Sequence, residues 1–190
     1  MNIVTKKEFL DNKSSYIKKI KVGAVFIYPT DTIYGLGCNA TNSKAVKRIR
    51  KIKQRDTAPF SVAVPSKKWI KDNCIVSKEA EKWLKKLPGP YTLLLKLKSK
   101  KAVATAVNPK TDILGVRIPN NWFSKIVKEA NIPIVSTSAN ITKKQHMTSL
   151  KDLNKTVAKQ VDFIIYEGKK QGKPSEIVML YEKKVKVIQR

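Results

Sequence analysis

Apolar and polar positions change their spacing many times along the chain, in short blocks that predict strands and helices. Runs of β-branched, aromatic and aliphatic residues are typical of strands, and apolar residues three or four positions apart are typical of helices. The pattern predicts strands at residues 24–28, 61–64, 91–98, 113–117, 134–137, 161–166 and 177–181. It predicts helices at 14–21, 122–130 and 149–159, and two more that begin after the N-caps Ser43 and Ser77.

Strands and helices mix in this order without strict alternation. The pattern therefore predicts an α/β fold in which a twisted mixed sheet is surrounded by helices, rather than a doubly wound fold. The helix that follows Ser43 has one clear apolar face and one basic face. The apolar face holds Ala45, Val46, Ile49 and Ile52. The basic face holds Lys44, Lys47, Arg48, Arg50 and Lys51.

The composition favours one soluble domain over residues 1–190. The chain has no linker, repeat or low-complexity block, and 42% of its residues are hydrophobic, which argues against disorder. No apolar run approaches the roughly 20 residues that span a bilayer. The first 15 residues carry charges where a signal peptide is apolar, so we expect a cytoplasmic protein with no membrane partner.

Several kinds of catalytic site are excluded by residues that the chain lacks. His146 is the only histidine and no motif surrounds it, which argues against a Ser-His-Asp triad. Cys38 and Cys74 are far apart and form no CxxC pair, so we expect two reduced thiols and no transition-metal site. There is no GxxxxGK[ST] loop of the kind that P-loop enzymes use.

The net charge of +26 has two interpretations. Lysine and arginine drive nonspecific binding to phosphates, which favours a polyanion such as RNA as a partner. Only five of the 40 basic residues are arginine, however, and the lysines are spread over every segment. Sequence-specific readers rely more on arginine, so the charge could equally reflect biased composition.

Three segments carry the strongest functional signal. The segment YPTDTIYGLGCNA (28–40) follows a strand with a turn rich in Thr, Asp and Gly, which leaves backbone N–H groups available to an anion. Lys53 and Arg55 close the basic helix, and IVSTSAN (134–140) places Ser138 and Asn140 after a second strand. Cations and hydroxyls of this kind suit phosphates and a small zwitterion.

These three segments, together with PGPYTLLL (88–95), GVRIP (115–119) and KPSEIV (173–178), resemble the YrdC/TsaC family of threonylcarbamoyl-adenylate synthases. The resemblance runs from about residue 18 to the C-terminus. It implies a YrdC-like fold with a basic concave face. The implied enzyme is a nucleotidyltransferase that makes threonylcarbamoyl-AMP and pyrophosphate from L-threonine, bicarbonate and ATP. Magnesium would accompany the triphosphate, and no protein-bound metal site is expected.

The resemblance also implies a place in tRNA modification, with a separate threonylcarbamoyl transferase complex acting downstream. On the nucleotide side it implies Lys53 and Arg55 as catalytic residues that face the triphosphate or the transferring phosphoryl. Further ATP contacts are expected from Ser138, Asn140, His146 and Arg190. On the threonine side the expected contacts are Thr30, Thr32, Arg117, Ser136 and Ser175, with Arg117 pairing with the threonine carboxylate.

Four positions depart from the family pattern, and one of them is His146, in a loop position often held by a small hydroxyl residue. Asp56 stands where many members have proline, and Ala63 stands where a two-domain branch has a histidine that contacts substrate. Glu176 replaces a hydroxyl residue and would bring negative charge near an anion site if it pointed inward. None of these departures falls on Lys53, Arg55, Ser138 or Asn140, so adenylation still fits the sequence, whereas the amino-acid preference is less secure.

Two other functions fit parts of the sequence. A non-catalytic module that binds double-stranded RNA or ribosomes would use the same fold, and the net charge favours it. The retained Lys53/Arg55 and Ser138/Asn140 pairs argue against it, because RNA binding would not require them. A carbamoyl-adenylating module of hydrogenase-maturation carbamoyltransferases would need acylphosphatase and zinc-finger segments, for which this chain has neither the room nor a CxxC pair.

Overall fold

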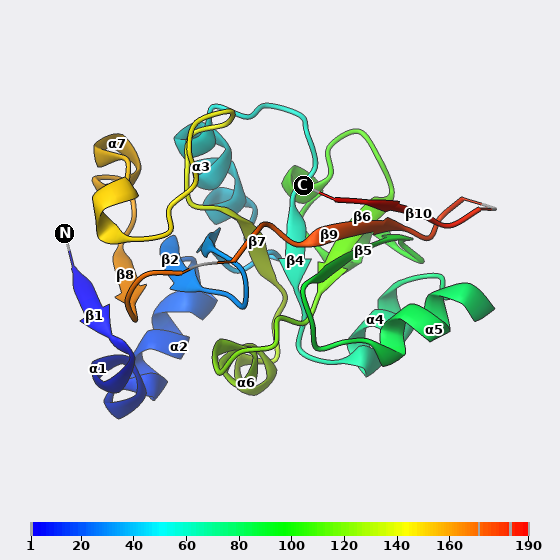
Figure 1. Ribbon diagram of the computed structural model, residues 1–190, viewed down its shortest axis with the longest axis horizontal. Coiled ribbons are helices and arrows are strands. Elements are labelled where there is room, and N and C mark those ends of the chain that lie inside the picture. Colours follow the sequence, from blue (N-terminus) through cyan, green and yellow to red (C-terminus); the bar gives the residue numbers. More distant parts are fainter. Residues whose placement is uncertain (1, 171, 183, 190) are drawn as a thin grey trace.

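The structure is a computed structural model that describes residues 2–170, 172–182 and 184–189. One twisted mixed sheet runs through this part of the chain, with the strand order β1-β8-β2-β3-β7-β4-β6-β5-β9-β10 (Figure 1). Its strands are β1 Ile3–Thr5, β2 Phe26–Pro29, β3 Tyr34–Gly37, β4 Ser61–Ala63, β5 Tyr91–Lys96, β6 Ile113–Arg117, β7 Ile134–Ser138, β8 Phe163–Tyr166, β9 Glu176–Met179 and β10 Lys186–Ile188. The predicted α/β fold with a mixed sheet is confirmed.

Parallel and antiparallel pairs alternate irregularly across the sheet. The central strands β2, β3, β7 and β4 are antiparallel to their neighbours within this group. β4 then pairs with β6 in parallel, and β5 pairs with β9 in parallel. Because no gap interrupts the ladder from β1 to β10, the sheet supports the prediction that residues 1–190 form one domain, which remains a prediction.

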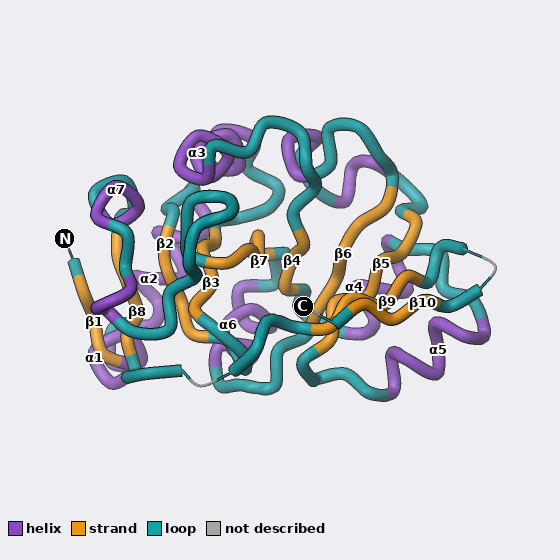
Figure 2. Tube along the Cα trace, turned by 45° about the horizontal axis from the view of Figure 1, so that its top comes forward, coloured by secondary structure: helices purple, strands orange, loops and turns teal. Residues whose placement is uncertain are grey.

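Helices cover the sheet and enclose two buried clusters (Figure 2). The helices are α1 Lys6–Asp11, α2 Lys13–Val22, α3 Ser43–Lys53, α4 Lys67–Asn73, α5 Lys78–Lys85, α6 Phe123–Ala130 and α7 Lys155–Ala158. Three short 3-10 helices join them, at η1 Lys100–Ala102, η2 Thr105–Val107 and η3 Leu150–Asp152. No helix in the described ranges is both long enough and apolar enough to cross a membrane.

The larger cluster packs the apolar face of α3 and residues of α4 and α5 against the central strands. On β5, Leu93 and Leu95 belong to this cluster, whereas Thr92 and Leu94 face a cavity on the other side. That separation follows from the two-residue period of a strand. The smaller cluster is rich in aromatic rings from α1, α2 and α6, with Phe26 stacked on Phe163 at 5.1 Å between centroids.

Three predictions about local structure were wrong. Asn42, not Ser43, caps α3, because the extended Asn42 backbone lets its side-chain oxygen accept the N–H of Ala45 at 3.1 Å. Residues 149–159 are two short helices, since the Asp152 carboxylate binds back to Ser149 and the chain restarts at the cap Asn154. Arg50 was assigned to the basic face of α3, opposite the apolar face, but it is buried with 9% of its surface exposed.

Candidate active site

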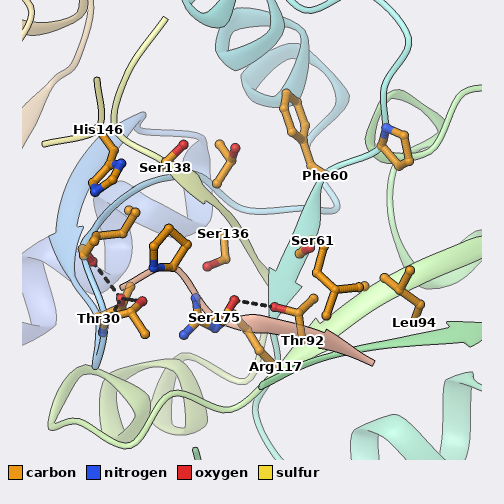
Figure 3. A pocket seen from close by; sticks show the side chains of 18 of the residues that line it. Thr30, Phe60, Ser61, Thr92, Leu94, Arg117, Ser136, Ser138, His146 and Ser175 are labelled. Atoms are coloured by element: carbon orange, nitrogen blue, oxygen red, sulfur yellow. Dashed lines mark hydrogen bonds between the residues drawn. The ribbon is translucent and has the colours of Figure 1, made fainter. Parts of the chain in front are cut away.

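A cavity of about 450 Å³ lies over the middle of the sheet. Its wall is built from six strands that are neighbours in the sheet, β3, β7, β4, β6, β5 and β9, and from the loops that end them (Figure 3). Among the predicted site residues, the lining includes Thr30, Thr32, Arg55, Arg117, Ser136, Ser138, His146 and Ser175. Segments that are far apart in the sequence therefore meet in one place.

The turn between β2 and β3 forms one end of the cavity. The Thr30 hydroxyl donates to the Ile33 carbonyl at 2.6 Å and accepts the backbone N–H of Thr32 at 3.1 Å. The hydroxyls of Thr30 and Thr32 lie 3.0 Å apart. Both residues are nearly fully buried, so this turn is held in one shape before any ligand arrives.

Arg117, at the end of β6, faces this turn and is already paired. Its Nη2 donates to the Asp31 carboxylate at 2.6 Å, and both side chains are less than a tenth exposed. Asp31 also accepts the backbone N–H of Asn120 at 2.8 Å. The Nε of Arg117 is buried and has no hydrogen-bond partner within the described chain. A carboxylate ligand would therefore meet a guanidinium that Asp31 orients and that keeps donors available.

Asp31 was missed by the sequence reasoning, although it stands in the middle of the TDT turn that carried the signal. The sequence does not reveal which aspartate meets Arg117, since 86 positions separate the two. Two serines complete this end of the cavity. Ser136 comes from β7, and the Ser175 hydroxyl lies 2.8 Å from that of Thr92 (Figure 3).

Residues between β8 and β9 contact β3 and the Thr30–Thr32 turn that precedes it. The Tyr34 hydroxyl fixes its start, donating to the Gly168 carbonyl at 2.7 Å and accepting the N–H of Glu167 at 3.1 Å. Further along, Gly172 packs directly on the backbone of Thr32. A Cβ at position 172 would lie 2.2 Å from the Thr32 carbonyl oxygen, so this close approach requires glycine.

The other end of the cavity contains the phosphate-binding candidates. Arg55 lines the wall, where its Nη2 donates to the Pro59 carbonyl at 2.6 Å and its guanidinium lies 5.1 Å from the ring centre of Phe60. His146 and Ser138 line the same region. The Arg190 prediction lies outside the described residues.

Lys53 lies beneath this region and is not among the residues that line the cavity. It is 2% exposed, and its Nζ donates to the carbonyls of Ser138 (2.6 Å) and Asn140 (2.7 Å) and to the Asn140 side-chain oxygen (2.9 Å). Burial lowers the pKa of Lys53 to about 7, and the positive charge of Arg55 also lowers it. The three oxygens oppose this shift because they favour the charged form.

Asn140 also lies behind the wall. Its side-chain oxygen accepts the Ser138 hydroxyl at 2.6 Å, and its side-chain nitrogen donates to the Lys144 carbonyl. Lys53 and Asn140 thus fix the backbone that presents Ser138. The sequence correctly brought Lys53, Ser138 and Asn140 together, but it did not predict which of them touch the cavity.

Of the four departures from the family pattern, His146 lines the cavity, whereas Asp56, Ala63 and Glu176 are not among its lining residues. Ser175 and Ile177 line the cavity on either side of Glu176, so strand alternation directs Glu176 to the other face. Ala63 is buried in the aromatic cluster, and Asp56 is exposed. Within the described chain no group of three or more His, Cys, Asp or Glu side chains could hold a metal.

A profile described as "Telomere recombination" for Sua5, YciO and YrdC proteins matches residues 18–190. The chain belongs to the Sua5/YciO/YrdC family. The expected family membership is thereby confirmed. The site described above is thus a cavity of this family's fold, formed by the same motifs that suggested the resemblance.

Two relatives carry the activity in their names. A protein of Methanocaldococcus jannaschii, provisionally named threonylcarbamoyl-AMP synthase, is 39% identical over 172 residues, covering 88% of this chain and 80% of the relative. The threonylcarbamoyl-AMP synthase of Buchnera aphidicola is 28% identical over 190 residues, covering 96% and 98%.

Two solved structures share the fold. Sua5 of P. abyssi complexed with L-threonine superposes with a TM-score of 0.84 at 29% identity, covering 98% of this chain. This chain spans only 56% of that protein's length. E. coli YciO superposes with a TM-score of 0.85 at 26% identity and is covered over 94% of its length.

Proposed function

We propose that this chain is an L-threonylcarbamoyladenylate synthase. The observation that carries the proposal is that one cavity has two ends with different chemistry. One has a buried arginine and hydroxyls suited to an amino acid, and the other has a cation and a serine suited to phosphates. The relatives named threonylcarbamoyl-AMP synthase support it. An enzyme of this kind is a nucleotidyltransferase, because it transfers the AMP group of ATP.

The reaction begins with the amine of threonine and bicarbonate, which give N-carboxythreonine and water. The new carboxylate oxygen attacks the α-phosphorus of ATP, the bond to the bridging oxygen breaks, and pyrophosphate leaves. A carboxylate is already a nucleophile at neutral pH, so this step needs no strong protein base. Catalysis then rests on alignment and fixed positive charge.

The threonine end of the cavity orients the nucleophile. The guanidinium of Arg117 binds the α-carboxylate of threonine, while Asp31 keeps the guanidinium from turning. Thr30 and Thr32 place hydroxyls beside the substrate, with Ser136 and Ser175 opposite them. The buried, hydrogen-bonded turn means that little order has to be created on binding.

The phosphate end of the cavity neutralises the nucleotide. Arg55 and Ser138 contact the phosphates, with His146 beside them, and the charge of Lys53 acts from below through the Ser138–Asn140 segment. Mg²⁺ enters with ATP and neutralises part of the triphosphate. Because no acidic cluster lies in the described chain, its ligands would be phosphate oxygens and water.

An apolar shelf lies between strands β5, β6 and β9. Leu94, Ile113 and Ile177 line the cavity there, and each is only partly buried. A half-exposed apolar surface inside a polar cavity suits a flat aromatic group. The adenine base of ATP is the part of the substrates with that chemistry.

The product would serve tRNA modification through a separate threonylcarbamoyl transferase complex. Contact with tRNA or other double-stranded RNA is a further proposal, which the net charge of +26 favours. A protein that only bound RNA would show affinity that falls steeply with salt and no threonine-dependent turnover. A cytoplasmic location remains a prediction.

The proposal is tested by pyrophosphate release from ATP, omitting threonine and bicarbonate in turn. Release that requires both supports carboxylation followed by adenylation. Release that needs threonine but not bicarbonate would indicate aminoacyl adenylation instead. A folded protein that binds RNA and releases no pyrophosphate would favour the binding module and contradict the proposal.

A further inference from the structure

Arg50 is a buried arginine that the mechanism above does not use. It lies in the last turn of α3, and its guanidinium points inward beneath the loop that follows the helix. The partners of this side chain are backbone carbonyls and an aromatic ring. The carbonyls belong to Ala106 (2.6 Å), Arg55 (2.8 Å), Asp56 (2.9 Å), Val107 (3.1 Å) and Ala58 (3.3 Å).

Three of these carbonyls belong to the loop that carries Arg55. The Nη1 of Arg50 donates to the carbonyls of Arg55, Asp56 and Ala58, so one nitrogen holds three carbonyls of the loop close together. The loop turns sharply to allow this. Gln54 has a left-handed backbone, with φ of 49°, and the N–H of Arg55 then bonds to the Arg50 carbonyl at 3.0 Å.

The remaining donors of Arg50 join this loop to another segment. Nε and Nη2 donate to the carbonyls of Ala106 and Val107, which both lie in η2. The Val107 carbonyl also accepts the N–H of Phe60. The ring of Phe60 lies 4.6 Å from the Arg50 guanidinium and 5.1 Å from that of Arg55. Arg50, Phe60 and Arg55 therefore form one connected unit at the phosphate end of the cavity.

We infer that Arg50 is a positioning residue, which sets the shape of the 55–58 loop and thereby aims Arg55 at the triphosphate. This inference rests on the proposed function, because it takes Arg55 as a phosphate ligand. The planar guanidinium is required, since it offers donors in a fixed fork toward five oxygens. A lysine at position 50 has at most three donors from a single point and cannot span both segments.

The effect should be selective for the nucleotide. In Arg50→Lys the loop keeps a buried charge but loses its shape, so the KM for ATP rises about 10- to 100-fold, as expected for a misplaced contact. The KM for threonine stays within about twofold, since Arg117 and the Thr30–Thr32 turn do not touch this loop. Arg50→Met, which removes every donor, should raise the KM for ATP further.

Arg48→Met is the matched control. It removes an arginine from the same helix, but Arg48 is 41% exposed and pairs with Asp162 on the surface. We expect unchanged KM values for both substrates, because exposed pairs contribute little. Far-UV circular dichroism and thermal unfolding of all variants, recorded beside the kinetics, distinguish a loss of folded structure from a misplaced Arg55 side chain.

ATP binding by calorimetry keeps this inference separate from the proposed function. A wild type that binds ATP without releasing pyrophosphate would overturn the synthase proposal, and weaker ATP binding by Arg50→Lys would still support the role of Arg50. The inference is overturned if folded Arg50→Lys binds ATP as the wild type does. It is also overturned if the KM values for ATP and threonine rise equally, which is the result expected if Arg50 only stabilises the fold. A wild type that binds no ATP would overturn it as well.

Discussion

The threonine end of the cavity is built from strand ends and one short turn, whereas the phosphate end is built from a helix terminus and loops. At the threonine end, Arg117 extends from β6 and is held by Asp31, with both side chains nearly buried. At the phosphate end, Arg55 lies on a loop and is partly exposed. Each end has a cation, and Arg117 at the first end has a carboxylate partner at hydrogen-bond distance.

This difference suggests two kinds of recognition. A small zwitterion offers few contacts, so its site gains most from groups that are ordered in advance. A triphosphate carries several charges and must also leave as pyrophosphate, which suits cations on loops that can adjust. The phosphate end is nonetheless anchored from behind, by Lys53 under Ser138 and by Arg50 under the Arg55 loop.

The largest effect is expected at the threonine end. Arg117→Ala removes one partner of a buried ion pair, which costs about 2–5 kcal/mol in binding when a ligand depends on it. We expect threonine-dependent pyrophosphate release to fall at least about 100-fold, with the unpaired Asp31 lowering stability by about 3–5 kcal/mol. ATP affinity measured by calorimetry on the folded variant should change little. An equal loss of ATP affinity would contradict the assignment of threonine and ATP phosphates to separate ends of the cavity.

The next largest effect separates the two cations of the phosphate end. Lys53→Met removes one hydrogen-bond donor from each of three oxygens, so we expect a loss of about 2–4 kcal/mol of unfolding free energy together with weaker ATP binding. Arg55→Ala should weaken ATP binding with less than about 1 kcal/mol lost in stability, since Arg55 is partly exposed. Urea unfolding and calorimetry measure both quantities. Equal stability losses would contradict the assignment of Lys53 as the buried anchor.

A smaller effect is expected from Gly172→Ala. The added methyl group meets the Thr32 backbone, and overpacking of this kind costs about 1–3 kcal/mol. We expect the KM for threonine to rise about tenfold while the KM for ATP stays the same. Lys173→Ala, at an exposed neighbouring position, is the control. If the KM for threonine did not change, the segment between β8 and β9 would not shape that end.

The smallest expected effect is a difference in proton uptake when ATP binds. Because the pKa of Lys53 is lowered to about 7, the amine is largely neutral above that pH, and a bound triphosphate raises the pKa again. ATP binding at about pH 8 should therefore take up close to one proton more in the wild type than in Lys53→Met. Calorimetry in buffers of different ionisation enthalpy measures this difference. Equal uptake would place the titrating group elsewhere.

Much of the fold could be predicted from hydrophobic spacing. The strand at 113–117 and the Ser77 cap were predicted with correct boundaries, because periodicity and capping are local signals. The strand β3 was missed, since YGLG contains two glycines and reads as a turn. The edge strands β1 and β10 were missed because they are short and mostly exposed, which leaves them little pattern.

The site residues were predicted through motifs, but their roles depend on tertiary contacts. Thr30, Arg117 and Ser175 line the cavity as expected. Spacing alone placed Arg50 on the basic face of α3, because nothing in the sequence shows that the carbonyls of 55–58 and 106–107 converge on it. The burial of Lys53 was hidden for the same reason, since its partners lie more than 80 positions away.

The most direct test of the account is detection of the product itself. The protein is incubated with ATP, threonine and ¹³C-bicarbonate, and the nucleotides are analysed by mass spectrometry. The account predicts threonylcarbamoyl-AMP that carries one ¹³C atom and forms together with pyrophosphate. Threonyl-AMP without label, or no adenylate from a folded protein that binds both substrates, would contradict it.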